Sequence, residues 1–191
     1  MCHQGGSVNA YGLVKLRDAC PGLLIDMRYA TEGNFFRSAL YDSGEAWLLE
    51  PTAAKLRRAQ ERLETLGYRL LVLDAYRPLS VQARMWEILP DPDFVAPMTR
   101  GSNHNRGAAV DVSLADSQGQ PLPMQSPFDD FSERASHDWA GASPEDRERR
   151  ESLRAAMEGA GFSAYSAEWW HYTDPETRTS PLIDVSIASL S

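Results

Sequence analysis

The stretch GSNHNRGAAVDVSL (residues 101–114) joins a polar turn to a strand and places two candidate metal ligands seven positions apart. Gly107 lets the chain fold back after His104, and residues 108–114 then alternate small or apolar side chains with polar ones, as a strand does. Histidine nitrogens and carboxylate oxygens are both good zinc ligands. The stretch therefore predicts that a histidine before the turn and Asp111 on the outgoing strand can bind one ion.

The four residues EWWH (168–171) offer a third ligand with an acid close to it. With His171 there would be three protein ligands and a fourth position for water, the arrangement of a catalytic zinc site. Glu168 lies three residues earlier, an offset that can place its carboxylate where it takes a proton from that water. The alternative interpretation is that Trp169 and Trp170 are core aromatics, that Glu168 is exposed, and that the histidines are structural.

The segment DAYRP (74–78) follows an apolar run that predicts a buried strand. Pro78 favours an extended backbone at Arg77, so the guanidinium at the end of that strand can present its fork of donors to an oxyanion. The alternative is an ordinary salt bridge from Arg77 to Asp74 or Glu87.

Helical and strand patterns alternate irregularly along the chain. A Ser-Pro-Glu-Asp start at 143–146 and a glycine after Leu66 mark helix ends. The expected helices cover residues 51–66, 79–89 and 144–157, the expected strands 23–29, 69–74, 108–114, 162–165 and 169–173, and a long loop covers 115–143. This order predicts the α+β class, with a single domain built on a mostly antiparallel central sheet flanked by helices.

The composition is that of one folded domain with an acidic surface. The chain has 191 residues, 42% of them hydrophobic, and a formal net charge of −8. This charge argues against nucleic acid as a partner and against attraction to an anionic membrane. No run of residues is apolar enough to span a membrane, so we expect a cytoplasmic protein. The alternative is a periplasmic or lipid-anchored protein, if Cys2 is the cysteine of a trimmed lipoprotein signal; a Cys2–Cys20 bridge has no support in the pattern.

Taken together, SNHNRGAAVD (102–111) and EWWH (168–171) resemble the zinc signature of the VanX/DdpX-type D-alanyl-D-alanine dipeptidases. The similarity covers most of the chain in the expected order. The further similar blocks are IDMRYATEGNF (25–35), LDAYRP (73–78), PDPDFV (90–95), SPFDDFSERASH (126–137) and GFSAYSAEWWHY (161–172). The resemblance implies the small zinc-peptidase fold shared with D,D-carboxypeptidases and hedgehog-type domains, here at residues 21–191 after an N-terminal segment, 1–20, that is partly flexible.

The resemblance also implies roles for individual residues. His104, Asp111 and His171 match the ligands of one Zn²⁺ ion. Glu168 matches the catalytic base, and Arg77 matches the arginine beside the scissile carbonyl.

Three further positions match residues that surround the dipeptide in the family: Ser102, Asp129 and Tyr29. Asp129 is the natural partner of a free ammonium group, and Ser102 with a backbone donor would bind the carboxyl end. The family's FDxMxERSH run appears here as FDDFSERASH (128–137), with one extra residue before the final Ser-His pair. The loop after Asp129 can therefore close differently over the cavity.

The expected activity is zinc-dependent hydrolysis of the dipeptide D-alanyl-D-alanine. A related D,D-carboxypeptidase or endopeptidase would keep the zinc and the base but act on longer peptidoglycan stem peptides. A zinc-stabilised binding module without turnover would need neither Glu168 nor Arg77, so their joint presence favours catalysis. The oligomeric state cannot be read from the sequence.

Overall fold

A five-stranded sheet is the centre of the computed structural model, which describes residues 7–92 and 95–190. Its strands, in spatial order, are β2 (Leu24–Ile25), β4 (Tyr68–Asp74), β5 (Ala109–Asp116), β7 (His171–Thr173) and β6 (Ser163–Ala164). Neighbouring strands are antiparallel except β2 and β4, which run parallel. The predicted α+β class with a mostly antiparallel central sheet is confirmed.

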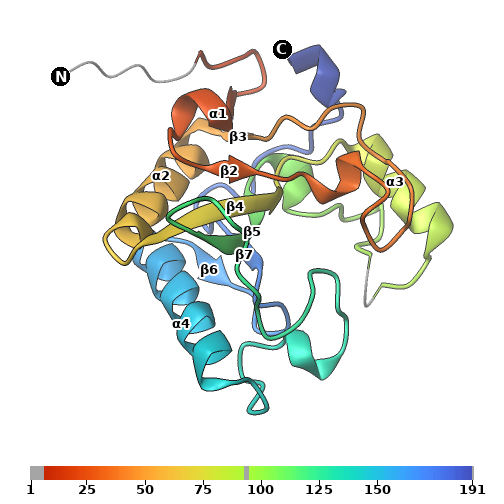
Figure 1. The fold of residues 1–191 in the computed structure, drawn as a ribbon. Coiled ribbons are helices and arrows are strands. Elements are labelled where there is room, and N and C mark those ends of the chain that lie inside the picture. The colour runs from red at the N-terminus through yellow and green to blue at the C-terminus, as the bar shows by residue number, and fades with distance from the viewer. Residues whose placement is uncertain (1–6, 93–94, 191) are drawn as a thin grey trace.

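Helices lie on both sides of this sheet (Figure 1). The α-helices are α1 (Leu16–Ala19), α2 (Glu50–Glu64), α3 (Leu79–Ile88) and α4 (Pro144–Gly159). The 3-10 turns are η1 (Arg28–Ala30), η2 (His104–Arg106), η3 (Glu133–Ala135) and η4 (Ile187–Leu190). In Figure 1, α2 and α4 lie together on one side of the sheet, while α3 and the loop after β5 lie on the other.

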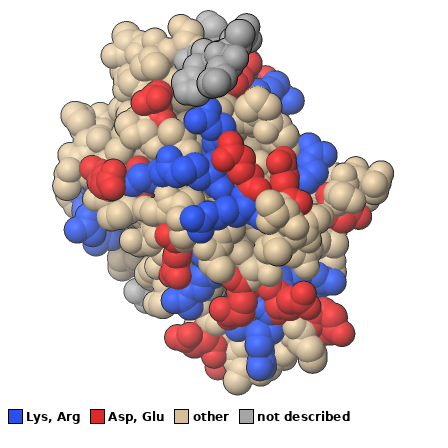
Figure 2. Space-filling model, turned by 90° about the vertical axis from the view of Figure 1, so that its left-hand side faces the viewer, with Lys and Arg blue, Asp and Glu red and all other residues tan. Residues whose placement is uncertain are grey.

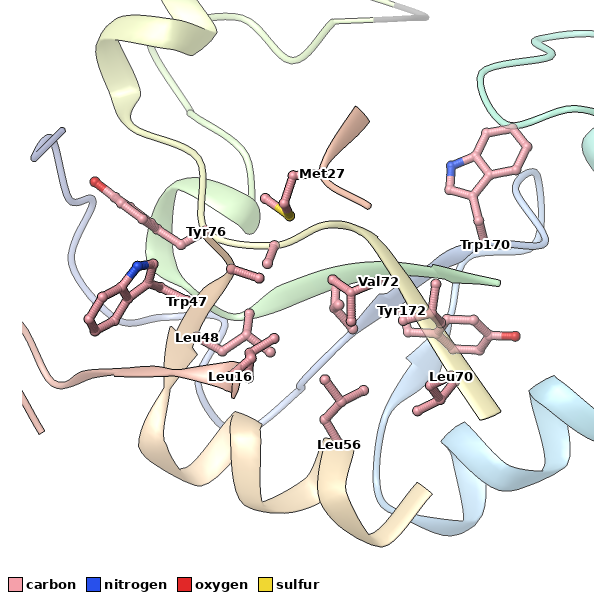
Figure 3. Packing of buried hydrophobic residues seen from close by; sticks show 14 of the residues in the cluster. Leu16, Met27, Trp47, Leu48, Leu56, Leu70, Val72, Tyr76, Trp170 and Tyr172 are labelled. Atoms are coloured by element: carbon pink, nitrogen blue, oxygen red, sulfur yellow. The ribbon is translucent and has the colours of Figure 1, made fainter. Parts of the chain in front are cut away.

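The main core lies between the sheet and α2. Leu56 of α2 points toward Leu70 and Val72 of β4 and Tyr172 of β7, and all four side chains are fully buried (Figure 3). Burying a leucine or valine side chain of this kind stabilises a protein by about 1.5–3 kcal/mol. Because Tyr172 faces this core, its neighbour His171 faces the opposite side of the sheet.

The helix α1 was not predicted, and two further parts of the chain differ from the predicted strands. Only Leu24–Ile25 of the expected strand 23–29 pairs with β4, and residues 28–30 form η1 because the Ala30 amide donates to the Met27 carbonyl. A second, two-stranded sheet, in which β1 (Leu13–Lys15) pairs with β3 (Trp47–Leu49), was not predicted. Strands of three residues are too short for an alternating pattern to identify.

The expected N-terminal segment, residues 1–20, includes β1 and α1, whose Leu13 and Leu16 side chains are fully buried in the core. Cys2, on which both the lipoprotein alternative and a bridge to Cys20 depend, lies outside the described residues. Cys20 is buried, and its thiol donates to the Ala53 carbonyl oxygen at 3.2 Å. In the described part of the chain, no helix has both the length and the apolar content that crossing a bilayer requires.

Charged side chains of both signs are interspersed on the face beside α2 and α4 (Figure 2). Two of the pairs on these helices, Arg57–Glu61 and Arg154–Glu158, are four residues apart. Such exposed pairs contribute only about 0.3–0.5 kcal/mol each.

A buried ion pair joins α2 to the segment after β7. The Lys55 ammonium donates to the Asp174 carboxylate at 2.6 Å, and the Thr52 hydroxyl donates to the same carboxylate at 2.9 Å. Burial alone would raise the pKa of Asp174, but the bond from Lys55 lowers it below the ordinary value. The pair therefore stabilises the fold above the ordinary aspartate pKa of about 3.9, and this stabilisation is lost as the pH falls through the lowered value.

Replacing Asp174 with Asn should destabilise the protein by about 3 kcal/mol, because it leaves the buried Lys55 ammonium without its closest carboxylate. Urea unfolding at neutral pH measures this change. The matched control is Asp138→Asn on an exposed residue, which should change the free energy of unfolding by less than about 0.5 kcal/mol. Equal stability of the two variants would show that the ion pair does not hold this segment.

Candidate metal centre and substrate cavity

The turn at residues 104–107 places His104 next to the sheet. Gly107 closes η2 in the left-handed conformation with φ of +65°, and its amide donates to the His104 carbonyl. A Cβ atom at Gly107 would lie 2.7 Å from the Leu13 side chain and 3.1 Å from the Leu49 amide nitrogen. Only glycine fits this approach without a shift, so the turn and the start of β5 depend on it.

Strand register brings Asp111 and His171 together. Asp111 of β5 lies directly opposite His171 of β7, so both side chains project from the same face of the sheet. His104 approaches this face from η2. The ligand atoms of the three residues all lie within 4.8 Å of one another, so the structure groups the three predicted metal ligands.

The spacing of these atoms suits a tetrahedral metal ion. Nε2 of His104 lies 3.2 Å from Nδ1 of His171, and the distances from these nitrogens to Oδ1 of Asp111 are 3.4 and 2.9 Å. Two ligand atoms that each lie about 2.0–2.1 Å from a tetrahedral ion are roughly 3.3 Å apart. The outer nitrogen of His104 donates to the Ala75 carbonyl oxygen at 2.8 Å, which leaves the lone pair of Nε2 facing the other ligands.

The charges of Asp111 and His104 affect each other. Burial alone would raise the pKa of the Asp111 carboxyl, but the charge and hydrogen bond of His104, and then those of His171, lower it well below its ordinary value. Burial alone would lower the pKa of His104, but the charges of Asp111 and Asp74 outweigh it, so this pKa lies above its ordinary value. The centre therefore combines an ionised Asp111 carboxylate with a His104 imidazole whose pKa that carboxylate raises, and a divalent cation can supply the positive charge instead.

A cavity of about 730 Å³ opens beside this group. All eight residues that the sequence singled out line it: Tyr29, Arg77, Ser102, His104, Asp111, Asp129, Glu168 and His171. They come from segments up to 142 positions apart (29 to 171), which the sheet and the loops after β5 and β6 bring together. The volume suits a small-molecule ligand.

Glu168 lies in the turn that leads into β7. Its amide donates to the Tyr165 carbonyl, and its own carbonyl accepts from the His171 amide at 3.3 Å. Burial raises the pKa of the Glu168 carboxyl, although His171 opposes the shift. Among residues 7–92 and 95–190, no group hydrogen-bonds to this carboxylate, so it is available to a ligand. Trp169 and Trp170 are indeed core aromatics, which leaves Glu168 in the cavity wall.

Arg77 is held rigidly at the end of β4. Its guanidinium donates to Asp74 at 2.6 Å, to Gln82 at 2.8 Å and to the Tyr41 hydroxyl at 3.3 Å. A guanidinium has five N–H donors, so three are used and two are left for a ligand. The salt bridge with Asp74 that the sequence offered as an alternative is therefore present, and Arg77 lines the cavity as well.

Asp129 and Tyr29 form a second polar group in the cavity wall. The Tyr29 hydroxyl donates to both carboxylate oxygens of Asp129, at 3.0 and 3.1 Å. Burial raises the pKa of the Asp129 carboxyl to about 7, although the Tyr29 bond opposes the shift. Asp129 also has a positive φ of 61°, a conformation that aspartate tolerates better than most residues. A half-buried carboxylate that forms no ion pair within the described residues suits a cationic ligand group.

The Ser102 hydroxyl accepts one backbone hydrogen bond and keeps its own hydrogen for another partner. Its oxygen accepts from the His104 amide at 3.2 Å, so the hydroxyl can still donate into the cavity. His137, which the sequence left as either a loop-orienting or a solvated residue, is 3% exposed and packs against Tyr172 on the far side of the sheet. It does not line the cavity.

Sequence reasoning missed the residues that orient these groups. Tyr41 and Gln82 hold Arg77, and Thr173 bonds to the outer nitrogen of His171 at 3.2 Å. Thr173 carries a signal that could have been used, because it lies two positions after His171 and so projects from the same face of a strand. Tyr41 carries none, since its loop has no regular pattern.

The chain is similar to known proteins over most of its length. The family model described as D-ala-D-ala dipeptidase matches residues 9–186. A D-alanyl-D-alanine dipeptidase from Escherichia coli (strain K12) is 36% identical over 171 residues, which cover 90% of this chain and 89% of that protein. A protein of the same name from Enterococcus faecium is 34% identical over 182 residues, covering 84% of this chain and 90% of its own.

A third D-alanyl-D-alanine dipeptidase, from Streptomyces coelicolor, is 32% identical over 176 residues, covering 80% of this chain and 86% of its own. The family match extends from before β1 to the segment that precedes η4, and so includes every residue that lines the cavity. The chain therefore belongs to the D-ala-D-ala dipeptidase family of metallopeptidases.

Proposed function

We propose that the protein is a zinc-dependent dipeptidase that hydrolyses D-alanyl-D-alanine. The observation that carries the proposal is the convergence of three metal-ligand atoms, an unpaired glutamate and a partly free arginine on one cavity. The names of the relatives support the choice of substrate. The proposal includes the kinship of this fold with hedgehog-type domains.

His104, Asp111 and His171 would hold the ion. Zinc, when bound there, supplies a Lewis acid that polarises a carbonyl oxygen and lowers the pKa of water to about 7. Glu168 then takes a proton from the attacking water while the water oxygen bonds to the carbonyl carbon. When the C–N bond breaks, Glu168 returns that proton to the leaving amine. Its position in the cavity wall and its unpaired carboxylate support this role.

Arg77 stabilises the oxygen that becomes negative during attack. The two N–H donors that Asp74, Gln82 and Tyr41 leave free are the source of this stabilisation. Burial would lower the pKa of Arg77, but Asp74 raises it well above its ordinary value, so the guanidinium stays charged throughout.

The ends of the cavity select for length. Asp129 pairs with the free ammonium of a dipeptide, and Ser102 donates to its carboxylate. A longer peptide would place an uncharged amide against Asp129 or Ser102 and leave a buried polar group unpaired, at a cost of about 1–3 kcal/mol.

Replacing Glu168 with Ala should reduce turnover of D-alanyl-D-alanine by about 10²–10⁴-fold, because it removes the general base. The variant should still bind zinc at a stoichiometry near one, since the three ligands remain. Elemental analysis of the purified variant, together with release of free D-alanine, measures both quantities. The control is His171→Ala, which should lose zinc and activity together. A fully active Glu168→Ala enzyme would contradict the assignment of the base.

The role of Asp129 predicts a pH dependence. Its charged form pairs with ammonium, and burial gives it a pKa of about 7, so the pairing is present above that pH and is lost below it. Asp129→Asn should raise KM for D-alanyl-D-alanine at pH 8, and the ratio of variant to wild-type KM should fall roughly tenfold by pH 6, as the charged fraction does.

Asparagine is the suitable replacement because it has the same shape and tolerates the positive φ at this position. N-acetylated D-alanyl-D-alanine, which has no ammonium, serves as the control substrate, and the variant and the wild type should differ little in their KM for it. A KM ratio that is constant between pH 6 and pH 8 would contradict an ammonium contact at Asp129.

A further inference from the structure

The outer nitrogen of His171 contacts Thr173, which Asn103 contacts in turn, and the proposed mechanism uses neither residue. Nε2 of His171 lies 3.2 Å from Oγ1 of Thr173, and Nδ2 of Asn103 donates to the same Oγ1 at 3.3 Å. Thr173 lies two positions after His171 in β7, so strand geometry places both side chains on the cavity face. Asn103 precedes His104 in the chain, so its contact with Thr173 links the segment that carries His104 to the strand that carries His171.

We propose that Thr173 and Asn103 are positioning residues for the metal centre. They hold the His171 ring with its proton on Nε2 and the lone pair of Nδ1 directed at the ion. The inference rests on the proposed role of His171 as a ligand. It goes beyond that role by assigning a function to two residues that touch neither the ion nor the reacting atoms.

The donor and acceptor roles support this assignment. A hydroxyl oxygen has two lone pairs, and the Asn103 amide can only donate to one of them. The other lone pair can accept a proton from Nε2 of His171, which lies 3.2 Å away. An ion bound at Nδ1 requires the imidazole proton to be on Nε2, so Thr173 then acts as the acceptor, and the bond from Asn103 holds its oxygen in place.

This bond matters because His171 has a competing arrangement. Nδ1 also lies 2.9 Å from Oδ1 of Asp111, so a proton on Nδ1 would be well bonded and would block the ligand lone pair. An acceptor at Nε2 favours the other tautomer. His104 has no such choice, because its outer nitrogen faces the Ala75 carbonyl oxygen, which can only accept. A partner for the outer nitrogen of a histidine ligand typically changes metal affinity by about 10- to 100-fold.

The test replaces the Thr173 hydroxyl with a methyl group. Thr173→Val keeps the volume and the β-branched shape that suit a strand, and it removes the acceptor. We expect the zinc dissociation constant, measured without substrate by competition with a chromophoric chelator, to rise by about 10- to 100-fold. Thr173→Ser restores the hydroxyl and should bind zinc more like the wild type than like Thr173→Val. Asn103→Ala should weaken zinc binding less than Thr173→Val does.

Thr65→Val is the matched control, because it makes the same chemical change at the exposed end of α2, where the hydroxyl donates to the Arg62 carbonyl. It should bind zinc like the wild type. The melting temperatures of the two metal-free variants, measured in excess chelator, should show that Thr173→Val is as well folded as Thr65→Val.

The outcomes separate this inference from the proposed function. A wild-type protein that binds no zinc would overturn both. If the wild type binds one zinc ion and Thr173→Val binds it equally tightly, the positioning role is wrong and the ligand role of His171 stands. Weak binding that Thr173→Ser does not restore would show that packing, not the hydroxyl, is responsible, and would also overturn the inference.

Discussion

The register between β5 and β7 is the constraint on which the rest of the site depends. It sets Asp111 opposite His171 and directs both side chains to the face of the sheet away from α2 and α4. The opposite face of the same strands carries Val110, Val112 and Tyr172 into the core, so a slip by one residue would turn the two candidate ligands into the core and the core residues toward the cavity. Hydrophobic burial and the grouping of the candidate ligands therefore require the same register.

The site also buries charged side chains, and removing a charge from water lowers the stability of the fold. Arg77 is buried, and it is tolerated because Asp74, Gln82 and Tyr41 satisfy it while two donors stay free. Asp129 is less well compensated, since burial raises its pKa to about 7 and its backbone has a positive φ. Such unfavourable features persist where the surrounding structure enforces them, and both lie in the wall of one cavity.

How far the sequence predicts this structure depends on the kind of pattern. Periodic segments such as α2, α3 and α4 were predicted to within a few residues, because their apolar spacing, proline starts and glycine stops are local signals. The parallel pairing of β2 with β4 and the sheet of β1 and β3 were not, since two- and three-residue strands are specified by tertiary contacts. The eight site residues came from motif chemistry and the family resemblance, whereas Tyr41 and Gln82 act through contacts that no spacing in the chain reveals.

The central claim is that one ion, held by His104, Asp111 and His171, makes the cavity an enzyme for a dipeptide. Its most direct test is to remove metal with a chelator, titrate zinc back, and follow hydrolysis of D-alanyl-D-alanine alongside a D-Ala-D-Ala-terminated pentapeptide. The account predicts that activity on the dipeptide disappears with the metal and returns linearly up to one zinc per chain, with little cleavage of the pentapeptide. Full activity in the metal-free protein, or preferential cleavage of the pentapeptide, would contradict it.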